Sequence, residues 1–108
     1  RQREMTMSAA AAIIEDRRLR VLMSINEMGN RMLNDEVLLR IVVSSGRATD
    51  FDTMRADLDF LERAGCVRIE KLPRQTASDI WVAHLTDAGI RAAECMQKIT
   101  GVARNLMF

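Results

Sequence analysis

Residues 58–67, with the sequence LDFLERAGCV, mark a change of structure along the chain. The apolar residues that lead into this stretch recur at steps of three and four, which is helical spacing; they are Phe51, Met54, Leu58 and Leu61. Gly65 is typical of the residue that ends a helix. Beyond it the apolar pattern alternates and includes the β-branched Val67 and Ile69, which predicts a strand over residues 66–72.

A second strand is expected over residues 80–85, where Trp81 and Val82 lie in another β-rich run. The residues between the two strands, 73–79, are polar and begin with proline, which is typical of a loop. The two strands therefore predict a hairpin with a long loop. Thr86 is expected to cap a final helix, whose apolar side comprises Ala88, Ala92, Cys95, Met96, Ile99 and Val102.

Three helices are expected before the hairpin. The first spans residues 8–28, begins at Ser8 and stops at Gly29 and Asn30. The second begins at Asn34 and stops at residues 44–46. We expect the second helix to be the central buried one, because its apolar residues lie nearly all round it; they are Val37, Leu38, Leu39, Ile41, Val42 and Val43.

The third helix is expected to begin at Thr49, which forms a variant of a capping box with Asp52. Its apolar stripe should be buried against Val37, Leu38, Ile41 and Val42. Three helices, a two-stranded hairpin and a last helix are the elements of a winged helix-turn-helix. We therefore expect one mainly α-helical domain over residues 1–108, with residues 86–108 as a C-terminal helix.

Two segments carry a resemblance to known regulators. Residues 58–67 resemble the end of the recognition helix and the entry to the wing in MarR- and ArsR-type transcriptional regulators, and residues 85–89 resemble their Leu-Thr-x-x-Gly signature. Together the segments bear on residues 34–95. The proportions are also similar to those of short winged-helix proteins of Mu-like phages and prophages. The resemblance implies a small DNA-binding transcriptional regulator of phage or bacterial type.

In those regulators the third helix enters the major groove of double-stranded DNA and the wing contacts the flanking backbone. Carried over, the resemblance places base contacts on residues 49–63 and backbone contacts on residues 68–78. The candidate DNA-binding residues are Arg47, Thr49, Thr53, Arg55, Arg68, Lys71 and Arg74.

The charge of the third helix opposes this function. Five acidic residues lie over residues 49–64, against two basic ones, Arg55 and Arg63, and carboxylates near phosphates weaken DNA binding. Two alternatives therefore stay open. The basic residues form an ordinary solvated surface, or the domain binds a protein partner through its acidic third helix and an exposed Phe60.

Apolar residues at both chain ends predict a homodimer formed by the first and last helices. The alternative is that these two helices pack on each other. The candidate residues of a protein interface are Phe60, Ile99, Val102, Leu106 and Phe108.

The sequence offers no sign of catalysis or of a cofactor. The net charge is +1, which does not mark a nucleic-acid-binding protein. Cys66 and Cys95 lack the close spacing of a metal site and are expected to be reduced, mostly buried thiols of a cytoplasmic protein. The acidic residues lack a partnering nucleophile, so we expect no enzyme, and no apolar run is long enough for a membrane span. Met7 is expected to be a native start, with residues 1–6 added or trimmed.

Overall fold

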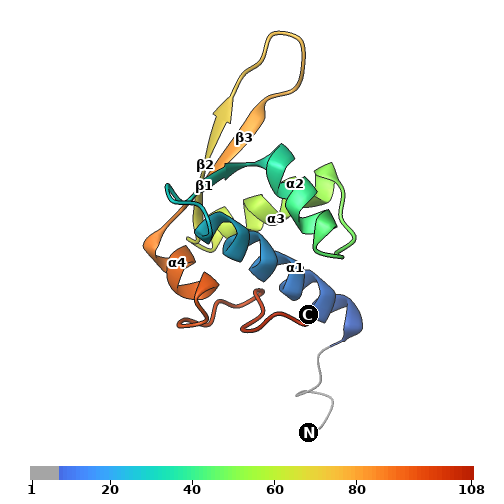
Figure 1. The fold of residues 1–108 in the computed structure, drawn as a ribbon, viewed down its shortest axis with the longest axis vertical. Helices are drawn as coiled ribbons and strands as arrows, with labels where there is room; N and C mark the ends of the chain where they lie inside the picture. The colour runs from blue at the N-terminus through green and yellow to red at the C-terminus, as the bar shows by residue number, and fades with distance from the viewer. Residues whose placement is uncertain (1–7) are drawn as a thin grey trace, which may run out of the picture.

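A long first helix runs through the middle of the computed structural model, which describes residues 8–108, with the sheet on one side of it and the C-terminal segment on the other (Figure 1). This helix, α1, spans Ala9–Asn26 and begins at Ser8, whose hydroxyl oxygen accepts a hydrogen bond from the Ala11 amide. Its buried side chains make α1 the central helix; the fully buried apolar ones are Leu19, Val21, Leu22 and Ile25. The expectations for residues 1–7 lie outside the described residues.

The second helix, α2, spans Asp35–Ser44 and is not the central helix, contrary to expectation. The Asn34 side chain caps it by accepting from the Val37 amide, as predicted. Leu38 and Val42 are fully buried, whereas Val37 and Val43 are 39% and 50% exposed. Only one face of α2 meets α1 and α3, so its apolar residues on the other face remain at the surface.

The third helix, α3, spans Phe51–Arg63. Three residues of its predicted stripe, Met54, Leu58 and Leu61, are fully buried, and Phe51 is partly buried. The cap is Asp50 rather than Thr49, because the Asp50 carboxylate accepts from the Thr53 amide at 2.7 Å. That hydrogen bond holds the pKa of Asp50 below its ordinary value.

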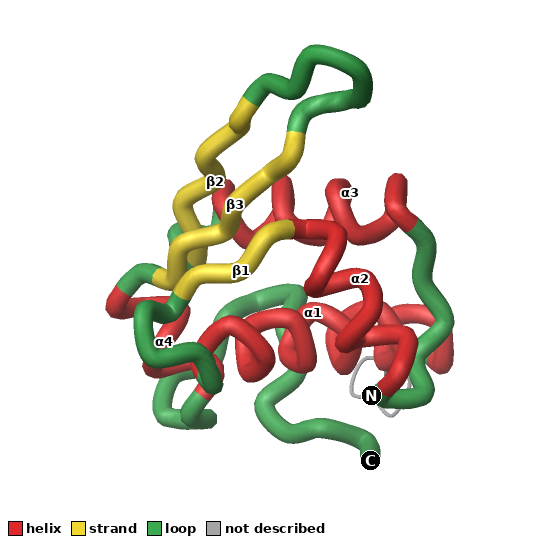
Figure 2. The backbone as a smooth tube through the Cα atoms, turned by 45° about the horizontal axis from the view of Figure 1, so that its top comes forward, coloured by secondary structure: helices red, strands yellow, loops and turns green. Residues whose placement is uncertain are grey.

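The strands form one three-stranded antiparallel sheet in the order β1-β3-β2. β2 spans Val67–Leu72 and β3 spans Ile80–Leu85, so the predicted hairpin is confirmed. β1, Met32–Asn34, was not predicted, because three residues are too few to show alternation. One face of the sheet packs on the helices, and the hairpin loop projects beyond them (Figure 2). Residues 8–108 thus form a small α+β domain of four helices and this sheet.

The last helix, α4, spans only Asp87–Ala93, so the prediction of a C-terminal helix over residues 86–108 is wrong beyond residue 93. Thr86 caps it by accepting from the Gly89 amide, as predicted. It ends in a turn in which the Met96 amide donates to the Arg91 carbonyl, with Cys95 at a φ of +61°. Glycine is the usual residue at that position, so the sequence contained no stop signal there.

Residues 94–108 return along α1 instead of extending away from it (Figure 1). The Ala103 amide donates to the Glu15 carbonyl, and Val102 is 1% exposed. Gly101 has a φ of +88°, and a Cβ there would lie 2.3 Å from the Phe60 ring. The apolar spacing that predicted a helix therefore reflects packing against α1 and α3. Across residues 8–108, no helix is both long and apolar enough to cross a membrane.

Candidate nucleic-acid interface

The hairpin is the most exposed of the predicted DNA contacts. All residues from 71 to 79 are exposed, and Arg68 on β2 is exposed as well. The Arg74 guanidinium lies 2.9 Å from the Glu36 carboxylate in a pair that is open to solvent on both sides. The Lys71 ammonium lies 4.5 Å from the centroid of the Trp81 ring. Arg74 also donates to the carbonyl of Ser78 in the same loop. All three basic residues are exposed, so a phosphate could reach their charges.

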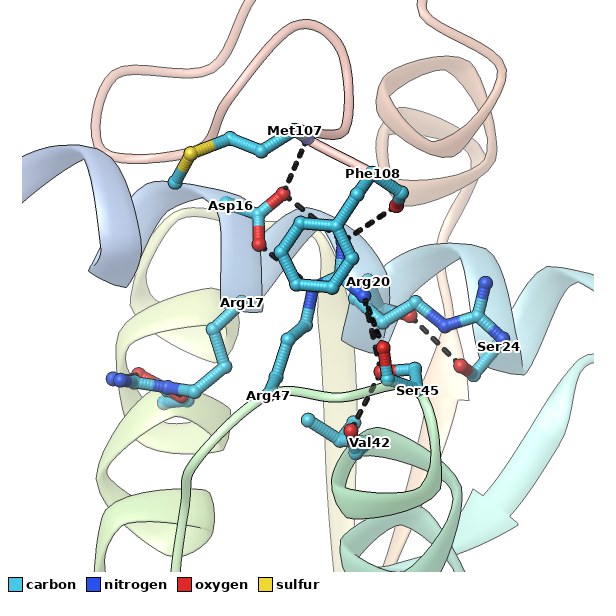
Figure 3. Close-up of polar contacts among 10 residues, drawn as sticks. Asp16, Arg17, Arg20, Ser24, Val42, Ser45, Arg47, Met107 and Phe108 are labelled. Atoms are coloured by element: carbon cyan, nitrogen blue, oxygen red, sulfur yellow. Dashed lines mark hydrogen bonds and ion pairs between the residues drawn. The ribbon is translucent and has the colours of Figure 1, made fainter.

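Arg47 is not on this surface, so its prediction as a phosphate contact is corrected. Its side chain is 5% exposed and binds the Asp16 carboxylate through two hydrogen bonds of 2.7 and 3.2 Å (Figure 3). It also donates to the carbonyls of Ser45 and Phe108 and lies 4.2 Å from the Phe108 ring centroid. Its donors are directed into the protein, where they join α1, the α2–α3 loop and the chain end.

The Asp16 carboxylate is charged because of these contacts. Burial alone would raise its pKa, but hydrogen bonds from Arg47 and from the Met107 amide, at 2.8 Å, lower it below the ordinary value of 3.8. A buried carboxylate that stays ionised needs such donors. Asp16 and Arg47 therefore form a structural ion pair.

Arg55 also has a structural partner. Its Nε lies 2.7 Å from the carboxylate of Asp35, which is fully buried at the start of α2. The same guanidinium donates to the Asp79 carbonyl and lies near the rings of Phe51 and Trp81. Arg55 thus joins α3 to α2 and to the base of the hairpin loop. Because its guanidinium is engaged within the protein, it is poorly placed to contact DNA.

Asp57 does not contribute to an acidic surface, because it is 1% exposed. Arg17 and Arg18 of α1 hydrogen-bond to its carboxylate at 3.0 and 3.1 Å. The hydrogen bond with Asp57 raises the pKa of Arg17. Arg18 also lies 3.8 Å from the centroid of the Phe60 ring. Because Arg18 and Gly101 cover this ring, Phe60 is not the exposed contact that was predicted.

The outward side of α3 is mainly acidic even without Asp57. Asp52, Ala56, Glu62 and Arg63 are exposed, and Asp59 is half-buried. Thr49 and Thr53 are half-buried near the start of the helix. The short side chains predicted to contact bases are therefore flanked by carboxylates.

The predicted protein-interface residues of the chain end are separated by the fold. Val102 lies in the core, and Ile99 and Leu106 are partly buried against it. Phe108 is 70% exposed although one side of its ring meets Arg47. With Ile13 and Met107, which are 54% and 52% exposed, it borders a hollow of about 250 Å³.

No group of three or more potential metal ligands occurs within residues 8–108. Cys66 is buried, and burial raises the pKa of its thiol. Cys95 is exposed at the end of α4, contrary to the expectation of a buried thiol. Comparisons of the chain with protein-family models, with curated proteins and with solved structures find no match.

Proposed function

We propose that this chain is a winged-helix domain that binds double-stranded DNA weakly, mainly through its hairpin. The observation that carries the proposal is the hairpin, which follows the packed helices α2 and α3 and projects beyond them (Figure 2). A helix pair followed by a projecting wing is the arrangement with which many transcriptional regulators contact DNA. The further proposal of a regulatory role of phage or bacterial type rests on the resemblance of residues 58–67 and 85–89 to known regulators.

The free energy needed to break each ion pair decides which basic residues can contact DNA. Releasing Arg47 or Arg55 would leave a buried carboxylate unpaired, which costs about 3–5 kcal/mol. Releasing Arg74 from its exposed pair with Glu36 costs about 1 kcal/mol or less. Arg68, Lys71 and Arg74 are therefore the expected phosphate contacts. Three such contacts give a slope of about −2.7 when the logarithm of affinity is plotted against that of salt concentration.

The test is the binding of a short duplex of random sequence, measured by fluorescence anisotropy at several salt concentrations. Replacing Arg68, Lys71 and Arg74 together with alanine should reduce affinity for all sequences alike and remove most of the salt slope. The matched control is Arg104→Ala, which removes an exposed base from the chain end and should leave binding unchanged. Equal losses in both variants, or no binding by the wild type at low salt, would refute the hairpin mode.

A second candidate is binding to a protein partner with a basic surface. It is favoured by the acidic outward side of α3, where Asp52 and Glu62 are exposed. The two candidates predict opposite effects of one variant, Asp52→Asn with Asp59→Asn. Loss of these charges should strengthen DNA binding, because repulsion of the phosphates is removed. It should weaken binding to a basic protein partner, because attraction is removed. Ala56→Arg is the better probe of the partner face than a change at Phe60, because Ala56 is exposed whereas Phe60 packs on Arg18.

We also propose that the domain forms a homodimer. The apolar residues that support the homodimer are Ile13, Met107 and Phe108, which are exposed around one hollow beside the N-terminal half of α1. Exposed apolar groups that lie together often mark a protein interface. Ile13→Asp should lower the sedimentation coefficient at high concentration if this face joins two copies. A wild-type monomer at all concentrations would refute it.

A further inference from the structure

Arg20 of α1 differs from the other shielded arginines of the described chain. Four of them, each less than a fifth exposed, hydrogen-bond to buried carboxylates; they are Arg17, Arg18, Arg47 and Arg55. Arg20 is 22% exposed, yet its nearest carboxylate is that of Glu27, which is 65% exposed and 3.9 Å from Nη2. That distance is beyond hydrogen-bonding range.

The Nε of Arg20 is also a buried donor without a partner, and it is the one such side-chain atom within residues 8–108. The guanidinium points away from the Asp16–Arg47 pair (Figure 3), so it cannot share that carboxylate. A shielded cation normally has an anionic partner, because removing its hydration without one is unfavourable. Among residues 8–108, the shielded guanidinium of Arg20 therefore has no anion hydrogen-bonded to it.

A hollow of about 330 Å³ lies beside Arg20, between α1 and α2. The other residues that line it are Arg40, Ile41, Ser44 and Ser45, and none of them is acidic. Arg40 and Ser44 are exposed on α2, and the described chain provides no ion pair or side-chain hydrogen bond to either of them. Two arginines and Ser44 thus line one hollow, and no acidic residue lines it with them.

The end of α2 does not supply the missing negative charge. Backbone amides of Ser45, Gly46 and Arg47 already donate to the carbonyls of its last turn. The Ser45 hydroxyl donates to the Val42 carbonyl and accepts from Arg47. These groups are satisfied within the protein, so the two arginines and the Ser44 hydroxyl remain for a ligand.

We propose that this hollow binds a phosphate group, with Arg20 of α1 and Arg40 of α2 as its cationic partners and the Ser44 hydroxyl as a further donor. A guanidinium presents two parallel N–H groups that match two oxygens of a phosphate. The phosphate is carried either by a small phosphorylated molecule or by a nucleic-acid backbone. The site does not involve the hairpin, so it stands independently of the proposed DNA contact.

The test is an NMR titration of the arginine Nε–Hε signals with inorganic phosphate, against sodium chloride at matched ionic strength. Phosphate should shift the Arg20 signal saturably and leave that of Arg104 unchanged. Arg40→Gln, at an exposed position where folding is not at risk, should weaken binding about tenfold or more. Glu27→Gln should strengthen it, because the competing carboxylate is removed. Arg104→Gln is the matched control and should bind as the wild type does.

Two further titrations distinguish the sources of the phosphate. A short DNA duplex that displaces inorganic phosphate at Arg20 would assign the site to a nucleic-acid backbone. Displacement by a nucleoside monophosphate, but not by the duplex, would assign it to a small molecule. The proposal is overturned if the Arg20 signal does not saturate, if all exposed arginines shift alike, or if Arg40→Gln binds phosphate as tightly as the wild type.

Discussion

Replacing Arg47 with alanine should remove a large part of the stability of the domain. In the wild type, the Asp16 carboxylate accepts two hydrogen bonds from Arg47, and its side chain is 3% exposed. The change leaves this buried carboxylate without its cationic partner. Breaking one side of a buried ion pair costs about 3–5 kcal/mol. Domains of this kind unfold with a free energy of about 5–15 kcal/mol. For a denaturant slope of about 2 kcal/mol per molar, the urea midpoint should fall by about 2 M.

The assay is urea denaturation at neutral pH followed by circular dichroism. Adding Asp16→Asn to Arg47→Ala should recover part of the loss, since no charge is then left unpaired. Arg74→Ala, which breaks only the exposed pair with Glu36, is the control and should cost about 1 kcal/mol or less. If Arg47→Ala does not fold, Arg47→Lys keeps the charge and should show an intermediate loss. A cost below about 1 kcal/mol for Arg47→Ala, or strict additivity with Asp16→Asn, would refute the reasoning.

Three further predictions concern stability. Asp50→Ala should cost about 1 kcal/mol because it removes the cap of α3; an unchanged melting temperature would contradict this. Gly101→Ala should cost about 1–3 kcal/mol, since its φ of +88° and the Phe60 ring both oppose a side chain, whereas Gly29→Ala, with open space around it, is a control. The folded-state pKa of Asp16 is lowered, so its contribution is full above about pH 4 and is lost as the pH falls through that pKa. Acid melts should therefore destabilise the wild type more steeply than Asp16→Asn, and parallel curves would exclude this role.

The sequence was most informative where structure depends on near neighbours. The caps at Asn34 and Thr86 were predicted because each side chain bonds an amide three residues away. The buried stripe of α3 and the hairpin were predicted for the same reason, since both follow from local periodicity. The end of α4 was missed because its last turn uses Cys95, a residue that carries no stop signal.

The candidate site was harder to predict, because the roles of its charges depend on residues far along the chain. Arg47 and Asp16 are 31 residues apart, and Arg17 and Asp57 are 40 apart. A count of charges cannot tell a paired arginine from a free one. One signal was present: Asp57 lies three residues after Met54 on the buried stripe. A charged residue at such a position has to be paired.

The path of the chain end bears on the order in which the domain folds. Met107 contacts Asp16 across 91 residues, and Gly101 contacts Arg18 across 83. α1 is therefore synthesised long before the segment that covers it. Contacts between such distant residues form late, because loop-closure entropy has to be overcome first. On the ribosome the contacts of Asp16 and Arg18 with the C-terminal segment cannot form until residues 101–108 have emerged. This part of the domain therefore folds only after the hairpin and α4 have been made.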